Sequence, residues 1–267
     1  MLPRFMQNKK DLAIIIPYIN LSNYILDLLR TISTKYSYHI YLIDNNSDQE
    51  TKKKLADLDK REYITIIYNN TNIGCASAWN QGIRAAIEEN NIDYAVILNN
   101  DILLHKDCID NMLLEMRVGC FPLVSAFDVC KDCAKPFDVL DLKIPFQRFI
   151  VDAPEFSCYA LDVKLLDKLK EREKDVEEYS GLFDQKFYPA YFEDNDFHYR
   201  LKLAGMRAVK TNTALYYHYG SRTIKENEEV GIISNTFYLT NQQRYIEKWG
   251  AKPGKEKFKI AFNLDNY

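Results

Sequence analysis

Residues 39–48 read HIYLIDNNSD, a short apolar run that ends in acidic and amide side chains. Similar apolar runs occur at 12–19 (LAIIIPYI), 63–74 (YITIIYNNTNIG) and 93–104 (DYAVILNNDILL). The segments between these runs have apolar residues at helical spacing. Apolar, β-branched runs that alternate with helices indicate βαβ units and a parallel sheet that is buried on both faces.

Polar residues follow these runs, at the edge of the sheet where ligands bind in open α/β proteins. The side chains expected there belong to residues 17–18, 44–47, 69–74 and 99–101. The turn after the first run, PYINLSNY, contains no glycine, which disfavours a glycine-rich phosphate loop. The sequence therefore predicts a polar crevice without such a loop.

The alternation stops after Cys120, and the chain becomes mixed. A helix rich in lysine and acidic residues is expected at 162–178, and a charged helix at 51–59. A further helix is expected before Gly205, and the amphipathic tail should end as a helix at Gly250. The sequence has no internal repeat or clear linker, so a single domain over residues 1–267 is expected.

Composition excludes several classes of protein. The formal net charge of −3 provides no basic stripe, so nucleic acid is disfavoured as a partner. No apolar run is long enough to span a membrane and no export signal is evident, so the cytosol is the expected compartment. Six irregularly spaced cysteines indicate reduced thiols. Cys130 and Cys133 could hold zinc or do redox chemistry, but ordinary thiols are favoured because no second C-x-x-C or nearby histidine completes a ligand set.

Residues 191–205, YFEDNDFHYRLKLAG, concentrate acidic and amide side chains in one short stretch. A helix N-terminus explains much of this, because carboxylates in a first turn interact favourably with the exposed N–H groups. Asp196 and Arg200 would add an i,i+4 ion pair that stabilises the helix by about 0.3 kcal/mol. Neither explanation accounts for the aromatic run FYPAYF at 187–192.

Taken in order, seven stretches resemble the family 2 glycosyltransferases of GT-A fold, and most closely their rhamnosyltransferase-like, cell-surface-glycan branch. The resemblance covers residues 11–250. Its stretches are LAIIIPYIN, YLIDNNSD, NNTNIGCASAWNQGIRAA, VILNNDILL, GLFDQKFYPAYFEDNDFHYRLKLAG, YYHYGSRT and RYIEKWG. It implies an α/β GT-A fold with a Rossmann-like, mostly parallel central sheet flanked by helices. Within it, residues 1–118 would bind the nucleotide sugar, 119–225 would form a mixed acceptor and catalytic half, and 226–267 a C-terminal helical tail.

The resemblance also implies a reaction: inverting transfer of a hexosyl group from a UDP- or dTDP-linked donor to a hydroxyl of a glycan or lipid-linked acceptor. The implied cofactor is Mn²⁺ or Mg²⁺. The chemistry requires a cation to neutralise charge on the leaving diphosphate and a general base to take the acceptor proton. Such an enzyme would serve polysaccharide biosynthesis in the cytoplasm, with peripheral contact at the inner face of a membrane as an open alternative.

By the same resemblance, Asp101 and His218 would bind the metal, with Asn99 where the family motif has its first aspartate. Mn²⁺ tolerates imidazole better than Mg²⁺ does. Asp194 would be the general base and Glu193 would position the acceptor or the sugar. Tyr188, Tyr191 and Phe192 would form an acceptor-binding wall that removes solvent from the base and raises its basicity.

For the nucleotide, Asp44 resembles the residue that accepts a hydrogen bond from the pyrimidine N3–H. Pro17 and Tyr18 would flank the base. The remaining residues expected to bind the nucleotide sugar are Asn20, Asn72, Gly74, Ser77, Asn80, Asn99, Asn100 and Asp101. Turn chemistry is an alternative role for the asparagines, because asparagine tolerates left-handed geometry and bonds its own backbone.

Two other functions remain open from the sequence. The chain could be a degenerate member that keeps the fold and binds a nucleotide sugar without turnover, since the first aspartate of the metal motif is missing. It could also be a sugar transferase that modifies nucleic acid, which the acidic balance disfavours.

Overall fold

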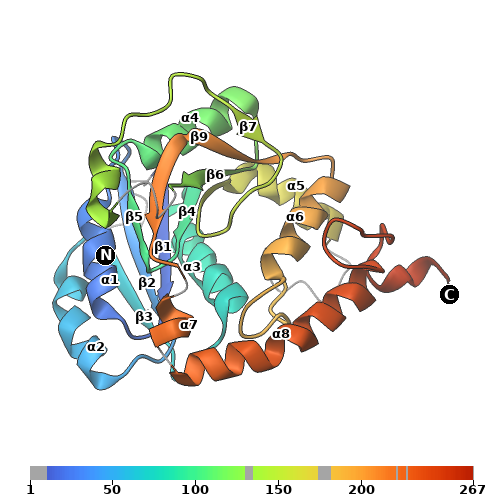
Figure 1. Cartoon of the computed structure of the whole chain (residues 1–267), viewed down its shortest axis with the longest axis horizontal. Coiled ribbons are helices and arrows are strands. Elements are labelled where there is room, and N and C mark those ends of the chain that lie inside the picture. Colours follow the sequence, from blue (N-terminus) through green and yellow to red (C-terminus); the bar gives the residue numbers. More distant parts are fainter. Residues whose placement is uncertain (1–10, 130–134, 174–181, 221, 227, 267) are drawn as a thin grey trace, which may run out of the picture.

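The computed structural model describes residues 11–129, 135–173, 182–220, 222–226 and 228–266. A nine-stranded sheet runs through it in the order β3-β2-β1-β4-β8-β6-β9-β5, with β7 paired to β9 (Figure 1). The strands are β1 (Leu12–Tyr18), β2 (Tyr38–Asp44), β3 (Ile64–Tyr68), β4 (Tyr94–Leu98), β5 (Ile102–Leu104), β6 (Leu123–Asp128), β7 (Ile150–Val151), β8 (Cys158–Asp162) and β9 (Ala208–His218). The helices are α1 (Ser22–Thr31), α2 (Gln49–Leu55), α3 (Cys75–Asn90), α4 (Cys108–Gly119), α5 (Val163–Glu173), α6 (Glu193–Leu203), α7 (Arg222–Glu226) and α8 (Glu228–Trp249).

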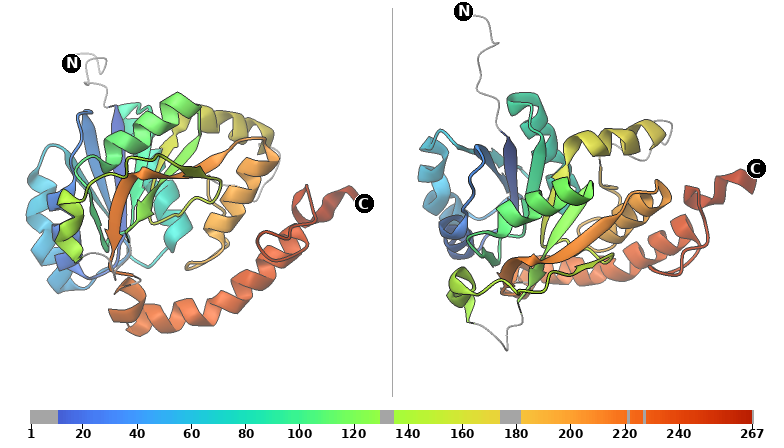
Figure 2. Two further views of the ribbon diagram at one scale, coloured as in Figure 1. Left: turned by 45° about the horizontal axis from the view of Figure 1, so that its top comes forward. Right: turned by 90° about the horizontal axis from the view of Figure 1, so that it is seen from above.

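The first four strands confirm the predicted parallel sheet. β1 pairs in parallel with β2 and β4, and β2 pairs in parallel with β3. On β1, Leu12, Ile14 and Ile16 pack into one core, which α1, α2 and α4 cover, whereas Ala13 and Ile15 pack into a second core under α3, α5 and α6. Successive side chains of a strand point to opposite faces, so each face of the sheet has its own core. The sheet therefore lies between two helical layers (Figures 1 and 2).

The second half of the chain makes the sheet mixed. β8 is inserted antiparallel between β4 and β6, and β6 runs parallel to β9. β5 pairs antiparallel with β9, with Ile102 opposite His218. This register brings the turn between β4 and β5, which carries Asp101, to the C-terminal end of β9.

Most of the expected helices form, with changes at their ends. The helix expected at 51–59 is wrong in extent: α2 spans Gln49–Leu55 and continues as a 3₁₀ helix, η2 (Ala56–Lys60). After this tighter turn, the Asp59 side chain accepts a hydrogen bond from the N–H of Ile66. α5 is described to Glu173, and the rest of the expected helix, like Cys130 and Cys133, lies outside the described residues.

α8 runs along the lower edge of the molecule in Figure 1 and ends at Trp249, directly before Gly250 as predicted. Tyr245 and Trp249 on this helix pack in a buried aromatic cluster with Phe187 and Phe192. Two more 3₁₀ helices lie at η3 (Pro136–Asp141) and η4 (Ala261–Asn266). Within the described residues, no helix is both long and apolar enough to cross a bilayer.

Candidate active site

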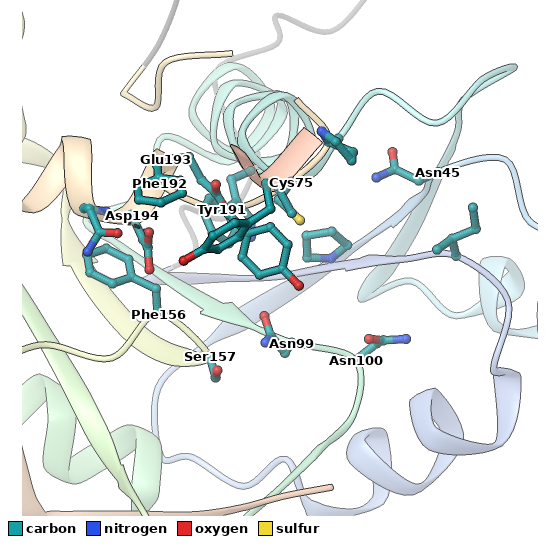
Figure 3. A pocket seen from close by; sticks show the side chains of 18 of the residues that line it. Asn45, Cys75, Asn99, Asn100, Phe156, Ser157, Tyr191, Phe192, Glu193 and Asp194 are labelled. Atoms are coloured by element: carbon teal, nitrogen blue, oxygen red, sulfur yellow. Dashed lines mark hydrogen bonds between the residues drawn. The ribbon is translucent and has the colours of Figure 1, made fainter. Parts of the chain in front are cut away.

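A cavity of about 720 Å³ opens at the carboxyl ends of β1 and β4. The N-terminus of α3 and the start of α6 form its other walls, where Cys75, Glu193 and Asp194 lie (Figure 3). Residues of α8 and of the loop after it also line the cavity. The structure brings together twelve of the seventeen residues that the sequence proposed: Pro17, Tyr18, Asn72, Gly74, Asn99, Asn100, Asp101, Tyr191, Phe192, Glu193, Asp194 and His218.

Five proposed residues lie outside the described cavity lining: Asn20, Asp44, Ser77, Asn80 and Tyr188. The amide of Asn80 is committed to Phe183, donating to its carbonyl at 2.8 Å and accepting from its N–H at 3.0 Å. Asn20 has the left-handed geometry of a turn, with φ of 57°, but its side chain accepts from the distant N–H of Asp48 at 2.8 Å and not from its own backbone. The Tyr188 ring stacks edge-on against Phe237 instead. Ligand contacts by these five residues stay predictions.

Asp44 is fully buried at the end of β2. Its Oδ1 accepts a hydrogen bond from the N–H of Ser47 at 2.7 Å, and its Oδ2 has no hydrogen-bond partner among the described residues. The Tyr18 hydroxyl is likewise buried without a described partner, and burial and the Asp44 charge raise the Tyr18 pKa. Leaving a buried polar atom unpaired costs about 1–3 kcal/mol, so this corner retains hydrogen-bonding capacity for a ligand.

Asp101 and His218 form a contact pair. Asp101 is 3% exposed, its Oδ1 lies 3.1 Å from Nε2 of His218, and its Oδ2 accepts the N–H of Arg222 at 2.8 Å. Burial opposes ionisation of Asp101, but the hydrogen bonds and charge of His218 and the Arg222 N–H outweigh it, and its pKa lies below the ordinary value. The carboxylate is therefore ionised and faces the cavity beside an imidazole.

This pair fits a divalent cation as a partial ligand set. Within the described residues, no group of three or more histidine, cysteine or acidic side chains could hold a metal. Carboxylate oxygen and imidazole nitrogen suit Mn²⁺, and such ions often take their other ligands from water and substrate phosphates. Asp101 and His218 would then be two protein ligands, with a diphosphate supplying others.

The backbone just before α6 is strained. Tyr191 and Phe192 have φ values of 76° and 74°, a left-handed conformation that is unfavourable for bulky residues. Asn241 on α8 holds this turn, because its Nδ2 donates to the carbonyls of Tyr188 at 3.0 Å and Ala190 at 2.8 Å. Strain of this kind persists where the surroundings enforce it, and it is frequent at functional sites.

The strained turn delivers Glu193 and Asp194 into the cavity at the first turn of α6 (Figure 3). Glu193 is 5% exposed, and its Oε2 has no described hydrogen-bond partner. Burial, and next the Asp194 charge, raise the Glu193 pKa well above its ordinary value. Burial also raises the Asp194 pKa, against hydrogen bonds from the N–H groups of Asn195 and Asp194. A raised carboxyl pKa is what proton abstraction near neutral pH requires.

The adjoining wall, at the N-terminus of α3, depends on glycine. Gly74 caps α3 with φ of 81°, and a Cβ there would lie 2.9 Å from the carbonyl oxygen of Pro189. The N–H of Cys75 donates to that same carbonyl at 2.8 Å. The close approach of α3 to the turn before α6 therefore needs glycine at position 74.

The Asp196–Arg200 pair belongs to a buried network of charges, so the stabilisation energy expected for it from the sequence is wrong. Asp196 and Arg200 are 0% and 2% exposed, with 3.4 Å between Oδ2 and Nη1. Asp196 also lies 2.8 Å from Nζ of Lys248 and accepts from Nε1 of Trp249 at 2.8 Å. Lys248 reaches Asp184 as well, at 2.7 Å. The energy of a solvent-exposed i,i+4 helix pair does not apply to this pair, because its two charges are buried away from water.

Asn45, expected at the crevice within 44–47, lines the cavity, but sequence reasoning missed several other residues of it: Ile19, Cys75, Trp79, Phe156, Ser157, Pro189, Ala190, Asn195, Tyr238, Gln242, Lys252 and Pro253. Cys75 had a signal, since it adjoins Gly74 in sequence. Phe156 and Ser157 precede β8, and only the antiparallel insertion of that strand places them at the cavity (Figure 3). Tyr238 and Gln242 are ordinary positions of an amphipathic helix.

The sheet, its two helical layers and the cavity at its carboxyl edge define the GT-A glycosyltransferase fold. Residues 13–137, a little under half of the chain, match the family model described as Glycosyl transferase family 2. Among curated proteins, no sequence matches the chain.

Solved structures of glycosyltransferases are similar in fold. A mannosyltransferase from Pyrobaculum calidifontis in complex with GDP-Man and Mn²⁺ has a TM-score of 0.57 and 16% identity, over 97% of this chain and 69% of that one. GalNAc-T7 with UDP, GalNAc and Mn²⁺ has a TM-score of 0.61 and 14% identity, over 91% of this chain and 48% of its own. TarS 1-349 of S. aureus has a TM-score of 0.56 and 14% identity, over 81% of this chain and 62% of its own. The chain thus spans less than two thirds of the last two proteins.

Proposed function

We propose that the protein is an inverting glycosyltransferase that moves a hexosyl group from a UDP- or dTDP-linked donor to a hydroxyl of a glycan or lipid-linked acceptor. The observation that carries the proposal is the convergence of two kinds of carboxylate on one cavity. Asp101 is ionised beside His218, whereas Asp194 has a raised pKa in a partly buried, aromatic surrounding. One suits a cation and the other suits proton abstraction.

In this proposal Asp194 takes the proton of the acceptor hydroxyl as the new glycosidic bond forms. Tyr191 and Phe192 exclude water from that carboxylate and offer ring faces to a sugar. Asp101 and His218 would hold Mn²⁺ or Mg²⁺, and the bound ion would neutralise charge on the leaving diphosphate. Burial and the Asp194 charge raise the Glu193 pKa, which favours its protonated form, and that form would donate a hydrogen bond to a sugar oxygen.

The unpaired Asp44 Oδ2 supports the base-recognition role of that residue, because a buried carboxylate oxygen is a good acceptor for the N3–H of uracil or thymine. The position of Pro17 and Tyr18 at the end of the neighbouring strand supports their place beside the base. Service in polysaccharide biosynthesis at the cytoplasmic face of a membrane belongs to the same proposal.

The test measures UDP and dTDP affinity and sugar release from their nucleotide sugars, with Mn²⁺ and with EDTA. Asp101→Asn and His218→Gln should each lower the rate by roughly a hundredfold. Each substitution should weaken UDP binding in Mn²⁺ but not in EDTA. The double variant should lose less activity than the two single losses combined, because both residues serve one ion. Asp107→Asn, at a side chain 51% exposed, is the matched control and should change neither quantity.

Full activity of Asp101→Asn in EDTA would exclude a metal at this pair. A protein that binds UDP or dTDP and never turns over any nucleotide sugar would be the degenerate binding module instead.

A further inference from the structure

Lys252 is the one lysine or arginine among the described residues that line the cavity. It follows α8, so it stands with Tyr238, Gln242 and Pro253 on the C-terminal side of the cavity. Asp101 and His218, by contrast, come from the β4–β5 turn and the end of β9. The Lys252 ammonium therefore lies on a different wall of the cavity from the proposed metal ligands, Asp101 and His218.

The loop that carries Lys252 is firmly held. It leaves α8 at Gly250, whose φ of 80° suits glycine, and it returns so that the N–H groups of Lys257 and Phe258 donate to the Trp249 carbonyl at 2.9 and 3.1 Å. Trp249 itself is fixed by its indole N–H on Asp196, in the first turn of α6. The loop thus has a defined place beside the turn that carries Glu193 and Asp194.

The charge of Lys252 is not neutralised within the described part of the chain. No ion pair joins it to a described residue, and the single acid of the loop, Glu256, accepts instead from Tyr245 Oη at 2.6 Å and the Gly254 N–H at 2.8 Å. Lys252 is also not among the groups that set the pKa of Asp194 or Asp101. Residues 250–259 carry four lysines and this one acid, in a protein whose net charge is −3.

We propose that Lys252 binds a phosphate group of the acceptor, so that the acceptor is an anionic, phosphate-bearing molecule and not a neutral sugar. This inference rests on the proposed function, which assigns the α6 and α8 side of the cavity to the acceptor. A lysine ammonium binds phosphate as a point charge, in the way that the P-loop lysine does. Asn195 and Gln242 add neutral amide donors to the same wall.

The test uses the full chain saturated with UDP and Mn²⁺, so that the donor end is occupied. Calorimetry then compares sn-glycerol 3-phosphate with glycerol, a matched pair that differs in the phosphate. Wild-type protein should prefer the phosphate by on the order of tenfold, as one charge-assisted hydrogen bond provides. Lys252→Gln should abolish the preference and Lys252→Arg should keep much of it. Lys259→Gln, an exposed lysine of the same tail that does not line the cavity, is the control and should keep all of it.

A second arm distinguishes the source of the phosphate. Binding to phosphatidylglycerol vesicles is compared with binding to phosphatidylcholine vesicles for the same variants. A Lys252-dependent preference for sn-glycerol 3-phosphate over glycerol indicates a phosphate on a soluble glycan. A Lys252-dependent preference for phosphatidylglycerol vesicles indicates a lipid-linked phosphate. Either result supports the proposal.

Absence of discrimination in both arms overturns the inference, as does a preference that survives Lys252→Gln. A preference seen only without UDP also overturns it, because the phosphate then occupies the donor end. UDP binding is measured first in the same protein. Its absence counts against the proposed function, whereas normal UDP binding without a phosphate preference counts against the inference alone.

Discussion

The two ends of the cavity, which we propose bind the donor and the acceptor respectively, are built differently. The donor end consists of short turns at the carboxyl ends of β1 and β4 and of the loop before α3, with Tyr18, Asn72 and Asn99 as examples. The acceptor end depends on the turn before α6, which α8 holds from far along the chain through Asn241, Lys248 and Trp249. One end follows from neighbouring strands, and the other follows from long-range contacts.

This difference teaches that the two ends can be altered separately. Parallel strands fix the donor end wherever the sheet forms, and its side chains are mostly amides and hydroxyls. The acceptor end needs buried charges to be paired correctly, since Lys248, Asp184 and Asp196 are all 0% exposed. Changes at the acceptor end should therefore leave nucleotide binding intact.

The largest expected effect is that of Asp194→Asn. The amide keeps the size of the carboxylate but cannot take a proton, so transfer to acceptor should fall by roughly two to four orders of magnitude. UDP affinity should stay near wild type, because the change lies at the acceptor end. Transfer rates and UDP titrations on the same preparation check both statements, and a variant that transfers sugar at the normal rate would refute the general-base role.

The next effect is on stability. Lys248→Met should lower the free energy of unfolding by about 3–5 kcal/mol, because it leaves buried carboxylates without their shared cation. The Lys164–Asp93 pair offers a matched control, since the Lys164 side chain is 74% exposed. Lys164→Met should cost less than about 1 kcal/mol.

Chemical denaturation of both lysine variants measures these costs, and UDP titration of the folded protein tests the separation of the two ends. If Lys248→Met weakened UDP binding as much as it weakened acceptor transfer, the two ends would be one cooperative unit.

The smallest effect concerns pH. Burial and Asp194 hold the folded pKa of Glu193 above its value in the unfolded chain, which is about 4.3. The folded state therefore binds this proton more tightly, and wild-type stability falls as pH rises from the unfolded pKa toward the folded one. The Asp194 charge on α6 acts on this carboxyl, and the carboxyl in turn adds to burial in raising the pKa values of Cys75 on α3, Tyr159 on β8 and Tyr191.

Glu193→Gln removes that pH-dependent loss. The variant should gain stability relative to wild type as pH rises from 4 to 8, at which pH values denaturant melts are compared. Glu247→Gln, at an exposed residue of α8, should show no such trend. A difference between Glu193→Gln and wild type that is constant with pH would mean that Glu193 titrates normally.

The fold was largely predictable from sequence and the acceptor end was not. Apolar runs such as 39–44 are local signals, and the residues that follow them reach the cavity because every parallel strand ends at one edge. Tyr191 and Phe192 could be proposed only through their place beside Glu193 and Asp194. Nothing local marks Lys252 or Asn241, whose positions depend on how α8 packs. The amide roles of Asn80 and Asn20 were also beyond local reasoning, because Phe183 and Asp48 lie on other elements.

The dependence of α6 on Lys248 and Trp249 has a consequence for biosynthesis. Chains emerge from the ribosome N-terminus first, at roughly 5–20 residues per second, and fold as segments become available. The β1 to β4 region can pair early, but the turn that bears Asp194 acquires its anchors only after residues 248–258 have been made. A nascent chain will therefore form the β1 to β4 scaffold several seconds before the proposed general base, Asp194, is in place.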